Sequence, residues 1–199
     1  MISYLEYIIP FLLALAMSAV FTPLVRKLAW KRKIVDEPNQ PRKIHKQPVP
    51  LLGGWAIWLS FTLVVLFFTF FTDRLLGGYM LLKYILGISL GGLVLMIGGY
   101  RDDKHKLKPS RQIIFPIIAA LIIIASGIGI EVVTNPLGGF IHLDSINIKL
   151  FTYHNLPYQF TLLADLFAFF WLLGMMYTTK FLDGLDGLVS GITTIGALI

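Results

Sequence analysis

The sequence contains no cysteine in its 199 residues. This absence excludes a disulfide framework, a Cys-based metal site and a thiol nucleophile. Charged residues are also scarce, at 14% of the chain, whereas a soluble domain has about 25%. Hydrophobic residues make up 56%, and the mean hydropathy is +0.76. One globular core of this size has no place for so many apolar residues, so the composition predicts a membrane protein.

Long runs without charge predict six membrane-spanning segments, since a spanning helix needs about 20 mostly apolar residues. The expected spans cover residues 5–26, 51–72, 77–100, 112–130, 158–180 and 187–199. The last run is too short to cross a bilayer and has no polar flank, so we expect a single domain, 1–199, that is incomplete at its carboxyl end. The predicted fold class is an all-α polytopic membrane bundle with five complete spans, a truncated sixth and a short extracytoplasmic β-hairpin around Asp144-Ser145.

Lys and Arg gather in two of the expected loops. The loop 26–46 holds eight of the seventeen and the loop 101–111 holds five more. The positive-inside rule places both loops in the cytoplasm and the amino terminus outside, in an inner (plasma) membrane. The first span lacks a basic leader and a small-residue cleavage site, so we expect it to be retained. This distribution explains the net charge of +6 without a nucleic-acid partner.

A first polar motif, DEPNQPRKIHKQPVPLLGG, runs from Asp36 to Gly54. Its prolines exclude a regular helix. Arg42, Lys43 and His45 lie within a few positions of one another, and such a cluster is suited to bind phosphate oxygens. The alternative is a plain basic loop, but the proline framing and the closing glycine pair favour function.

A second motif, GGYRDDKHK, places Asp102 beside Asp103 where the third span ends. Adjacent carboxylates repel one another unless something offsets their charge. Mg²⁺ with a phosphate substrate offers that offset, because Mg²⁺ takes oxygen ligands and keeps several waters. The alternative is a solvated pair balanced by neighbouring cations.

A third motif, KFLDGLDGLVSG, follows the fifth span. Asp183 and Asp186 are three residues apart and would share one face of a helix. Ionisable residues beside spans are costly, so they indicate a functional site. A single Asp-Gly is typical of a turn, whereas the doubled DGLDGL favours function.

Two expected spans separate each motif from the next, so all three should face the same compartment. The cation distribution predicts that this compartment is the cytoplasm. Four carboxylates and a basic loop would then form one site for phosphoryl chemistry, where positioning and charge neutralisation do most of the catalytic work.

The three motifs, in this order, resemble those of the polyprenyl-phosphate N-acetylhexosamine-1-phosphate transferase family (glycosyltransferase family 4). The Arg42-Lys43-x-His45 loop resembles that of the branch that initiates O-antigen and teichoic-acid synthesis. The resemblance implies transfer of a sugar phosphate from UDP-N-acetylhexosamine to undecaprenyl phosphate, in cell-wall or surface-polysaccharide synthesis. It also implies Mg²⁺, with Mn²⁺ as an alternative, and leaves a homodimer open.

The resemblance implies roles for individual residues. The catalytic and metal-binding carboxylates would be Asp102, Asp103, Asp183 and Asp186. The substrate-binding residues would be Arg42, Lys43, His45 and Lys180.

The chain departs from the family at Lys180, where relatives have an Asn that contacts metal or substrate. An ammonium there would instead hold a phosphate or pair with Asp183. We expect Asp165 and the histidines His105, His142 and His154 to lie outside the site. The main alternative function is a transporter or channel in which Lys180 and the nearby acids line a path. A non-catalytic scaffold is a third.

Overall fold

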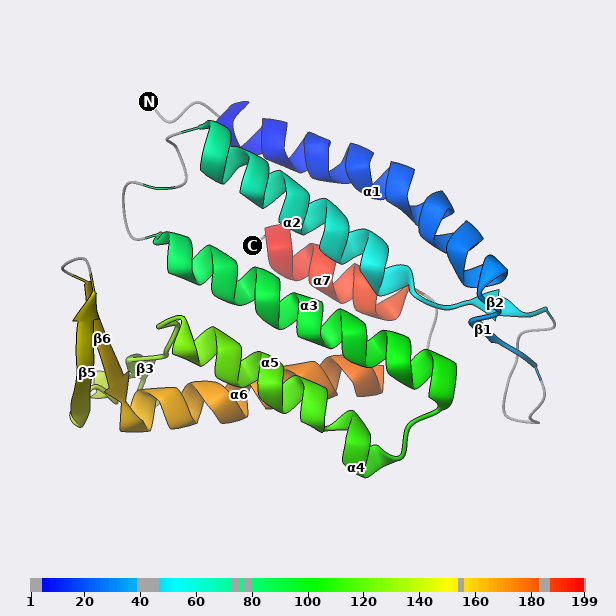
Figure 1. Ribbon diagram of the computed structural model, residues 1–199. Helices are drawn as coiled ribbons and strands as arrows, with labels where there is room; N and C mark the ends of the chain where they lie inside the picture. The colour runs from blue at the N-terminus through cyan, green and yellow to red at the C-terminus, as the bar shows by residue number, and fades with distance from the viewer. Residues whose placement is uncertain are drawn as a thin grey trace. The chain divides into compact units, whose positions relative to one another are not determined.

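The computed structural model describes residues 5–38, 47–72, 76, 80–153, 156–182 and 187–198, and the fold is mostly helical (Figure 1). Four helices are long and apolar enough to cross a membrane: α1 (Leu5–Lys31), α2 (Gly53–Phe71), α3 (Leu82–His105) and α6 (Leu162–Leu182). Shorter helices are α4 (Pro109–Gln112), α5 (Ile114–Ala125) and α7 (Leu188–Leu198). The chain divides into two compact units, 1–119 and 120–199.

In the first unit α1 packs along α2, and α2 packs along α3 (Figure 1). The core at one end of this layer consists of Val25, Ala29, Ile34, Leu52 and Ala56. Elsewhere large apolar side chains face outward; Phe70 and Phe71 are 65% and 76% exposed. An outer surface this apolar is costly in water and favourable against lipid tails, so it agrees with a membrane location.

Two contacts hold α3 against its neighbours in the first unit. The Trp58 indole Nε1 donates to the Ser89 carbonyl at 3.2 Å, which joins α2 to α3. Gly98 lies so close to Phe115 that a Cβ at this position would come within 2.4 Å of the ring. The missing side chain therefore allows α5 to begin directly beside the end of α3.

Short strands close the long loop between α1 and α2. Strand β1 (Val35–Asp36) pairs antiparallel with β2 (Val49–Pro50), and the Leu51 N–H donates to the Ile34 carbonyl at 3.1 Å. Leu52 then adopts a left-handed conformation, with φ 75°, immediately before α2. The loop therefore leaves and rejoins the helical layer at one point.

The second unit contains two hairpins rather than the single one that the sequence predicted. Strand β3 (Val132–Thr134) pairs with β4 (Phe140–His142), and β5 (Asn147–Tyr153) pairs with β6 (Leu156–Thr161). The predicted strands 140–143 and 146–151 both exist, but each pairs with a different partner. Asp144-Ser145 is therefore a connection between hairpins and not a hairpin turn.

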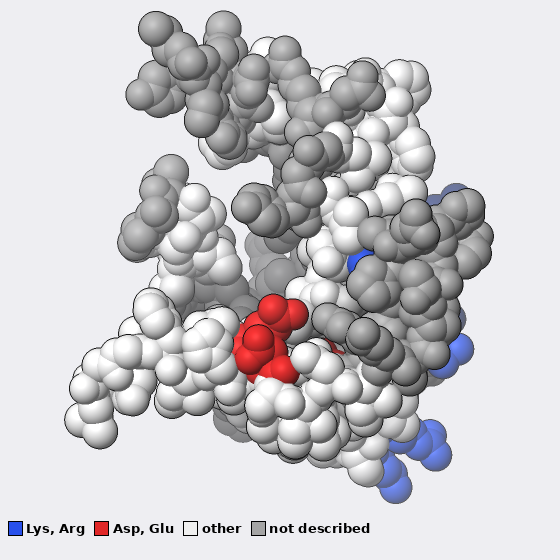
Figure 2. Space-filling model, turned by 90° about the vertical axis from the view of Figure 1, so that its left-hand side faces the viewer, with Lys and Arg blue, Asp and Glu red and all other residues white. Residues whose placement is uncertain are grey.

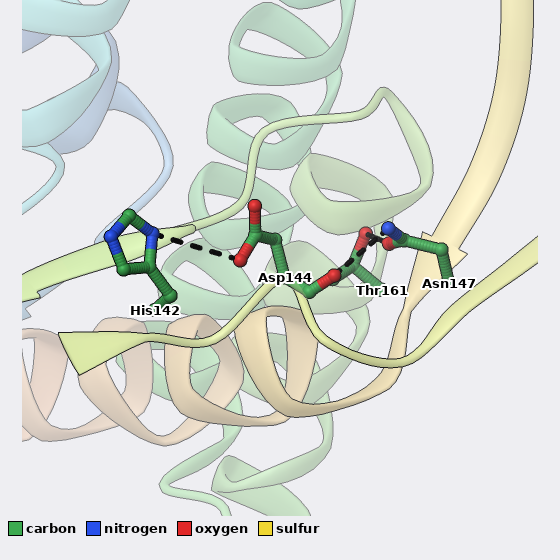
Figure 3. Close-up of polar contacts among 4 residues, drawn as sticks. All are labelled: His142, Asp144, Asn147 and Thr161. Carbon is green, nitrogen blue, oxygen red and sulfur yellow. Dashed lines mark hydrogen bonds and ion pairs between the residues drawn. The ribbon is translucent and has the colours of Figure 1, made fainter.

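Polar contacts around this connection tie β5 to the start of α6 (Figure 3). The Thr161 hydroxyl donates to the Asn147 side-chain oxygen at 2.8 Å, and the Asn147 amide donates to the Asp144 carbonyl at 2.9 Å. His142 Nδ1 lies 3.8 Å from Asp144 Oδ1 on the exposed surface. Figure 2 shows a group of acidic side chains on one face of the molecule. His142 thus has a surface partner within the hairpin segment.

The predicted number of spans is not confirmed. The expected span 112–130 is instead the shorter pair α4 and α5, which ends at Ala125. Ser126 caps the end of α5 by donating to the Ile123 carbonyl, and Gly127 follows with φ 92°. The expected span 158–180 begins only at Leu162, because 156–161 form β6.

Candidate functional site

The two adjacent carboxylates, Asp102 and Asp103, lie in the last turn of α3 and are half-buried. Successive residues of an α-helix point about 100° apart. The two side chains therefore face different surroundings. The carboxyl end of a helix carries partial negative charge, which disfavours carboxylates there. The negative charge of each carboxylate is therefore disfavoured at this position, and each carboxylate has different hydrogen-bond donors beside it.

Asp102 is held by the turn that follows α3. Its Oδ1 atom accepts hydrogen bonds from the Leu107 N–H at 3.1 Å and from Gln112 Nε2 at 2.8 Å. Gln112 Nε2 also donates to the Leu107 carbonyl at 2.9 Å. Lys106 enables the turn by adopting a left-handed conformation, φ 47°. One oxygen of Asp102 therefore anchors the 103–112 turn, while no hydrogen bond to its second oxygen is found within the described part of the chain.

Asp103 has the residue that closes the basic loop as its neighbour. The Leu52 backbone amide lies beside the Asp103 carboxylate and favours its charged form. Leu52 also immediately precedes α2, whose amino end carries partial positive charge. The amide and the positive end of α2 favour negative charge on Asp103, whereas its burial and the adjacent Asp102 carboxylate oppose it more strongly. This contact joins the first predicted motif to the second.

The base of the basic loop is therefore fixed next to the carboxylates. Asp36 pairs with Val49, and the chain continues from there to Leu52. Arg42, Lys43 and His45 lie outside the described residues, so their roles stay predictions. Both ends of their loop, however, are anchored in the first unit.

The second acidic motif is untested in the same way. Asp183 and Asp186 lie outside the described residues. Lys180 is in the last turn of α6 and is exposed. Because this motif belongs to the second unit, its predicted convergence with Asp102 and Asp103 stays a prediction.

Two contributors to the site were missed by the sequence reasoning. Leu52 acts through its backbone amide, for which an apolar side chain gives no signal. Gln112 gave a weak signal, as a lone uncharged polar side chain at the start of an apolar run. Both act by positioning a carboxylate.

The carboxylates match the chemistry of a magnesium site, although none of the described residues form a group of three or more His, Cys, Asp or Glu side chains that could hold a metal. Asp102 and Asp103 provide only oxygen atoms, which are the ligands that Mg²⁺ prefers. The half-buried position of both side chains leaves part of each carboxylate accessible. The metal-binding role of all four predicted aspartates stays a prediction.

The fold and site define a polytopic membrane protein with a carboxylate site at the end of an apolar helix. The chain belongs to glycosyl transferase family 4, whose pattern it matches over residues 85–199. The family resemblance predicted from the motifs is therefore confirmed.

Three relatives with assigned names illustrate what the chain is similar to. The chain is 25% identical over 192 residues to a probable undecaprenyl-phosphate N-acetylglucosaminyl 1-phosphate transferase of Bacillus subtilis, covering 96% of this chain and 46% of that protein. It is 28% identical over 179 residues to the decaprenyl-phosphate N-acetylglucosaminephosphotransferase of Mycolicibacterium smegmatis, covering 89% and 40%. It is 27% identical over 192 residues to a phospho-N-acetylmuramoyl-pentapeptide-transferase of Staphylococcus aureus, covering 93% and 56%.

The chain thus spans about half the length of the curated relatives it matches. No solved structure matches it significantly.

Proposed function

We propose that the whole protein transfers N-acetylhexosamine-1-phosphate from a UDP-sugar to undecaprenyl or another polyprenyl phosphate. An oxygen of the lipid phosphate forms a bond to the sugar-bearing phosphorus of the donor. The bond from that phosphorus to the UMP oxygen breaks, and UMP leaves. The products are a lipid-diphosphate sugar and UMP. This balance holds whether the displacement is direct or passes through a covalent enzyme intermediate.

One observation carries the proposal: the Leu52 amide lies beside the Asp103 carboxylate where the basic loop rejoins the helical layer. This proximity places one end of the loop that carries the predicted phosphate-binding residues beside the carboxylate pair. Cations and carboxylates near one another are what a diphosphate and its counter-ion need.

The individual residues take the following roles in the proposal. Asp103 and Asp102 orient the attacking lipid phosphate. Arg42, Lys43 and His45 bind donor phosphate oxygens, and Lys180 holds a phosphate in place of the family's Asn. Mg²⁺ held by the four aspartates would neutralise charge on the departing phosphate.

We further propose that the site faces the cytoplasm of an inner (plasma) membrane, with the amino terminus outside. The distribution of Lys and Arg supports this orientation. N-acetylglucosamine is the proposed sugar and the O-antigen/teichoic-acid branch the proposed subfamily. The similarity to the probable N-acetylglucosaminyl 1-phosphate transferase of Bacillus subtilis supports the sugar, and the Arg42-Lys43-x-His45 pattern supports the branch.

The test is a transfer assay with the full-length protein, radiolabelled UDP-N-acetylglucosamine, undecaprenyl phosphate and Mg²⁺. Label should enter a lipid extract, and UMP should form in equal amount. Uptake of label into vesicles without any lipid product would contradict the proposal and favour a transporter. Omitting Mg²⁺ and restoring activity with Mg²⁺ or Mn²⁺ tests the metal separately.

A further inference from the structure

The first unit contains a pocket of about 480 Å³ close to the carboxylate pair. The ends of α1 and α3 and the beginning of α2 supply its walls. Most of its lining is apolar, including Leu28, Trp55 and Ile97. Its polar lining consists of Arg32, Tyr100 and Arg101. The pocket is therefore amphipathic.

Two arginines supply the positive charge of this pocket, and their described contacts include no carboxylate. Arg32 Nη1 lies 3.5 Å from the Tyr100 hydroxyl. Throughout the described ranges, neither Arg32 nor Arg101 forms an ion pair with a carboxylate. Lys104 adds further positive charge, with its Nζ 5.9 Å from the centre of the Tyr100 ring. Positive charge at an apolar surface is stabilised when an anion binds beside it.

Only an amphipathic anion satisfies both parts of this lining. A free nucleotide would leave the apolar wall unused, and a neutral lipid would leave the two guanidinium groups unpaired. Basic pockets between membrane helices are a recognised arrangement for anionic lipid headgroups. We propose that this pocket binds one anionic phospholipid, with its phosphate at Arg32 and Arg101 and its acyl chain along Leu28, Trp55 and Ile97.

The pocket is also connected to the carboxylates. Leu52 contributes to its lining, and the Leu52 backbone amide lies beside the Asp103 carboxylate. Arg101 directly precedes Asp102 in α3. A bound lipid therefore restrains the same residue that lies beside Asp103. This inference is independent of the proposed reaction, because lipid binding is measured without turnover.

Fluorescence quenching of Trp55 in the full-length protein tests the proposal. The protein is titrated in separate experiments with phosphatidylglycerol and with phosphatidylcholine, each brominated on its acyl chains. The Trp55→Phe variant identifies the part of the fluorescence signal that comes from Trp55. The phosphatidylglycerol probe should quench at lower mole fraction. The double variant Arg32→Gln/Arg101→Gln should weaken its apparent affinity roughly 10- to 30-fold, because each cation near the surface contributes about 1 kcal/mol.

Two matched variants keep the result interpretable. Arg26→Gln/Arg111→Gln removes the same charge from exposed positions outside the pocket and should leave quenching nearly unchanged. Arg32→Lys/Arg101→Lys retains the charge and should retain most of the preference, even if the Gln variant does not fold. Equal quenching by the two probes, or equal losses in the two Gln variants, would overturn the proposal. Undecaprenyl phosphate and unlabelled phosphatidylglycerol are then added as competitors at equal mole fraction. If only undecaprenyl phosphate displaces the brominated phosphatidylglycerol, the pocket belongs to the acceptor lipid instead.

Discussion

Two carboxylates at helix ends, Asp103 and Asp165, illustrate how similar residues are used differently. Asp103 lies at the carboxyl end of α3, where the helix dipole disfavours its charge, and the Leu52 amide lies beside it. Asp165 lies in the first turn of α6, where the dipole favours its charge, and it is only 9% exposed. Its Oδ2 accepts a hydrogen bond from the Thr161 N–H at 2.9 Å.

The second oxygen of Asp165 is also enclosed. A Cβ placed on Gly129 would come within 3.0 Å of Asp165 Oδ1. Asp165 therefore accepts a hydrogen bond at the start of α6 in a buried position. Burial opposes the charge of both acids, and each has a backbone amide beside it. The comparison therefore teaches that the two differ in helix position, since α3 ends near Asp103 whereas α6 begins near Asp165.

The largest expected effect is on transfer by the Asp103→Asn protein. Removing this charge should lower the rate of transfer by at least about 100-fold. Rates fall by about this factor when an enzyme loses a group that stabilises charge in the transition state. Stability should be retained, because the change relieves an unfavourable helix-end charge. The transfer assay and a thermal melt measure the two effects. Asp165→Asn is the control and should retain most activity; equal activity in both variants would remove Asp103 from the site.

A smaller effect is expected when Asp102 loses its side-chain donor. Gln112→Leu removes the amide that donates to Asp102 Oδ1 and to the Leu107 carbonyl. A hydrogen bond to a charged group contributes about 1.5–3 kcal/mol, so transfer should fall roughly 10- to 100-fold. As a positioning effect, it should change the Mg²⁺ concentration for half-maximal activity as well as the rate. A rate loss with an unchanged Mg²⁺ titration would show that Gln112 has only a structural role.

The sequence predicted much of this arrangement, for identifiable reasons. The run 51–72 became α2, 53–71, because Gly53-Gly54 and Thr72 bound a continuous apolar segment. The sequence pointed to Asp102 and Asp103 because adjacent carboxylates at the end of an apolar run repel one another unless another group offsets their charge. The first span was expected to stop at residue 26, but α1 continues to Lys31, since charged residues end a membrane segment without ending a helix.

Other features could not be predicted, because they depend on pairing or on backbone groups. The strands 140–142 and 147–153 were visible in the alternating pattern, but alternation does not specify which strand is the partner. The Leu52 amide could not be found from a side-chain pattern, and its left-handed conformation is unusual for a leucine. The position of the Asp102-Asp103 pair at the end of a helix could therefore be predicted from the sequence, whereas the backbone and amide groups beside the pair could not.

Packing beside the carboxylates provides a third test, through neighbouring glycines. Gly98→Ala would place a Cβ 2.4 Å from Phe115, so α3 and α5 must move apart, at a cost of about 1–3 kcal/mol. Gly99 has open space around its missing Cβ, so Gly99→Ala should stabilise α3 by about 0.5–1 kcal/mol. Thermal melts of the two variants measure the difference. Equal shifts would contradict close packing of Gly98 on Phe115, and with it the placement of the 103–112 turn.

The smallest expected effect comes from Asp165, the acid at the start of α6. Asp165→Ala removes the acceptor of the Thr161 N–H, and loss of a helix cap costs about 1 kcal/mol. Asp144→Ala is a suitable control, because that carboxylate is 49% exposed and lies 3.8 Å from His142 on the surface. Its removal should change the melting temperature less than the Asp165 substitution does. If the Asp165→Ala protein keeps wild-type stability but loses transfer activity, Asp165 belongs with the functional acids. The distinction between the acid at the end of α3 and the acid at the start of α6 would then fail for this protein.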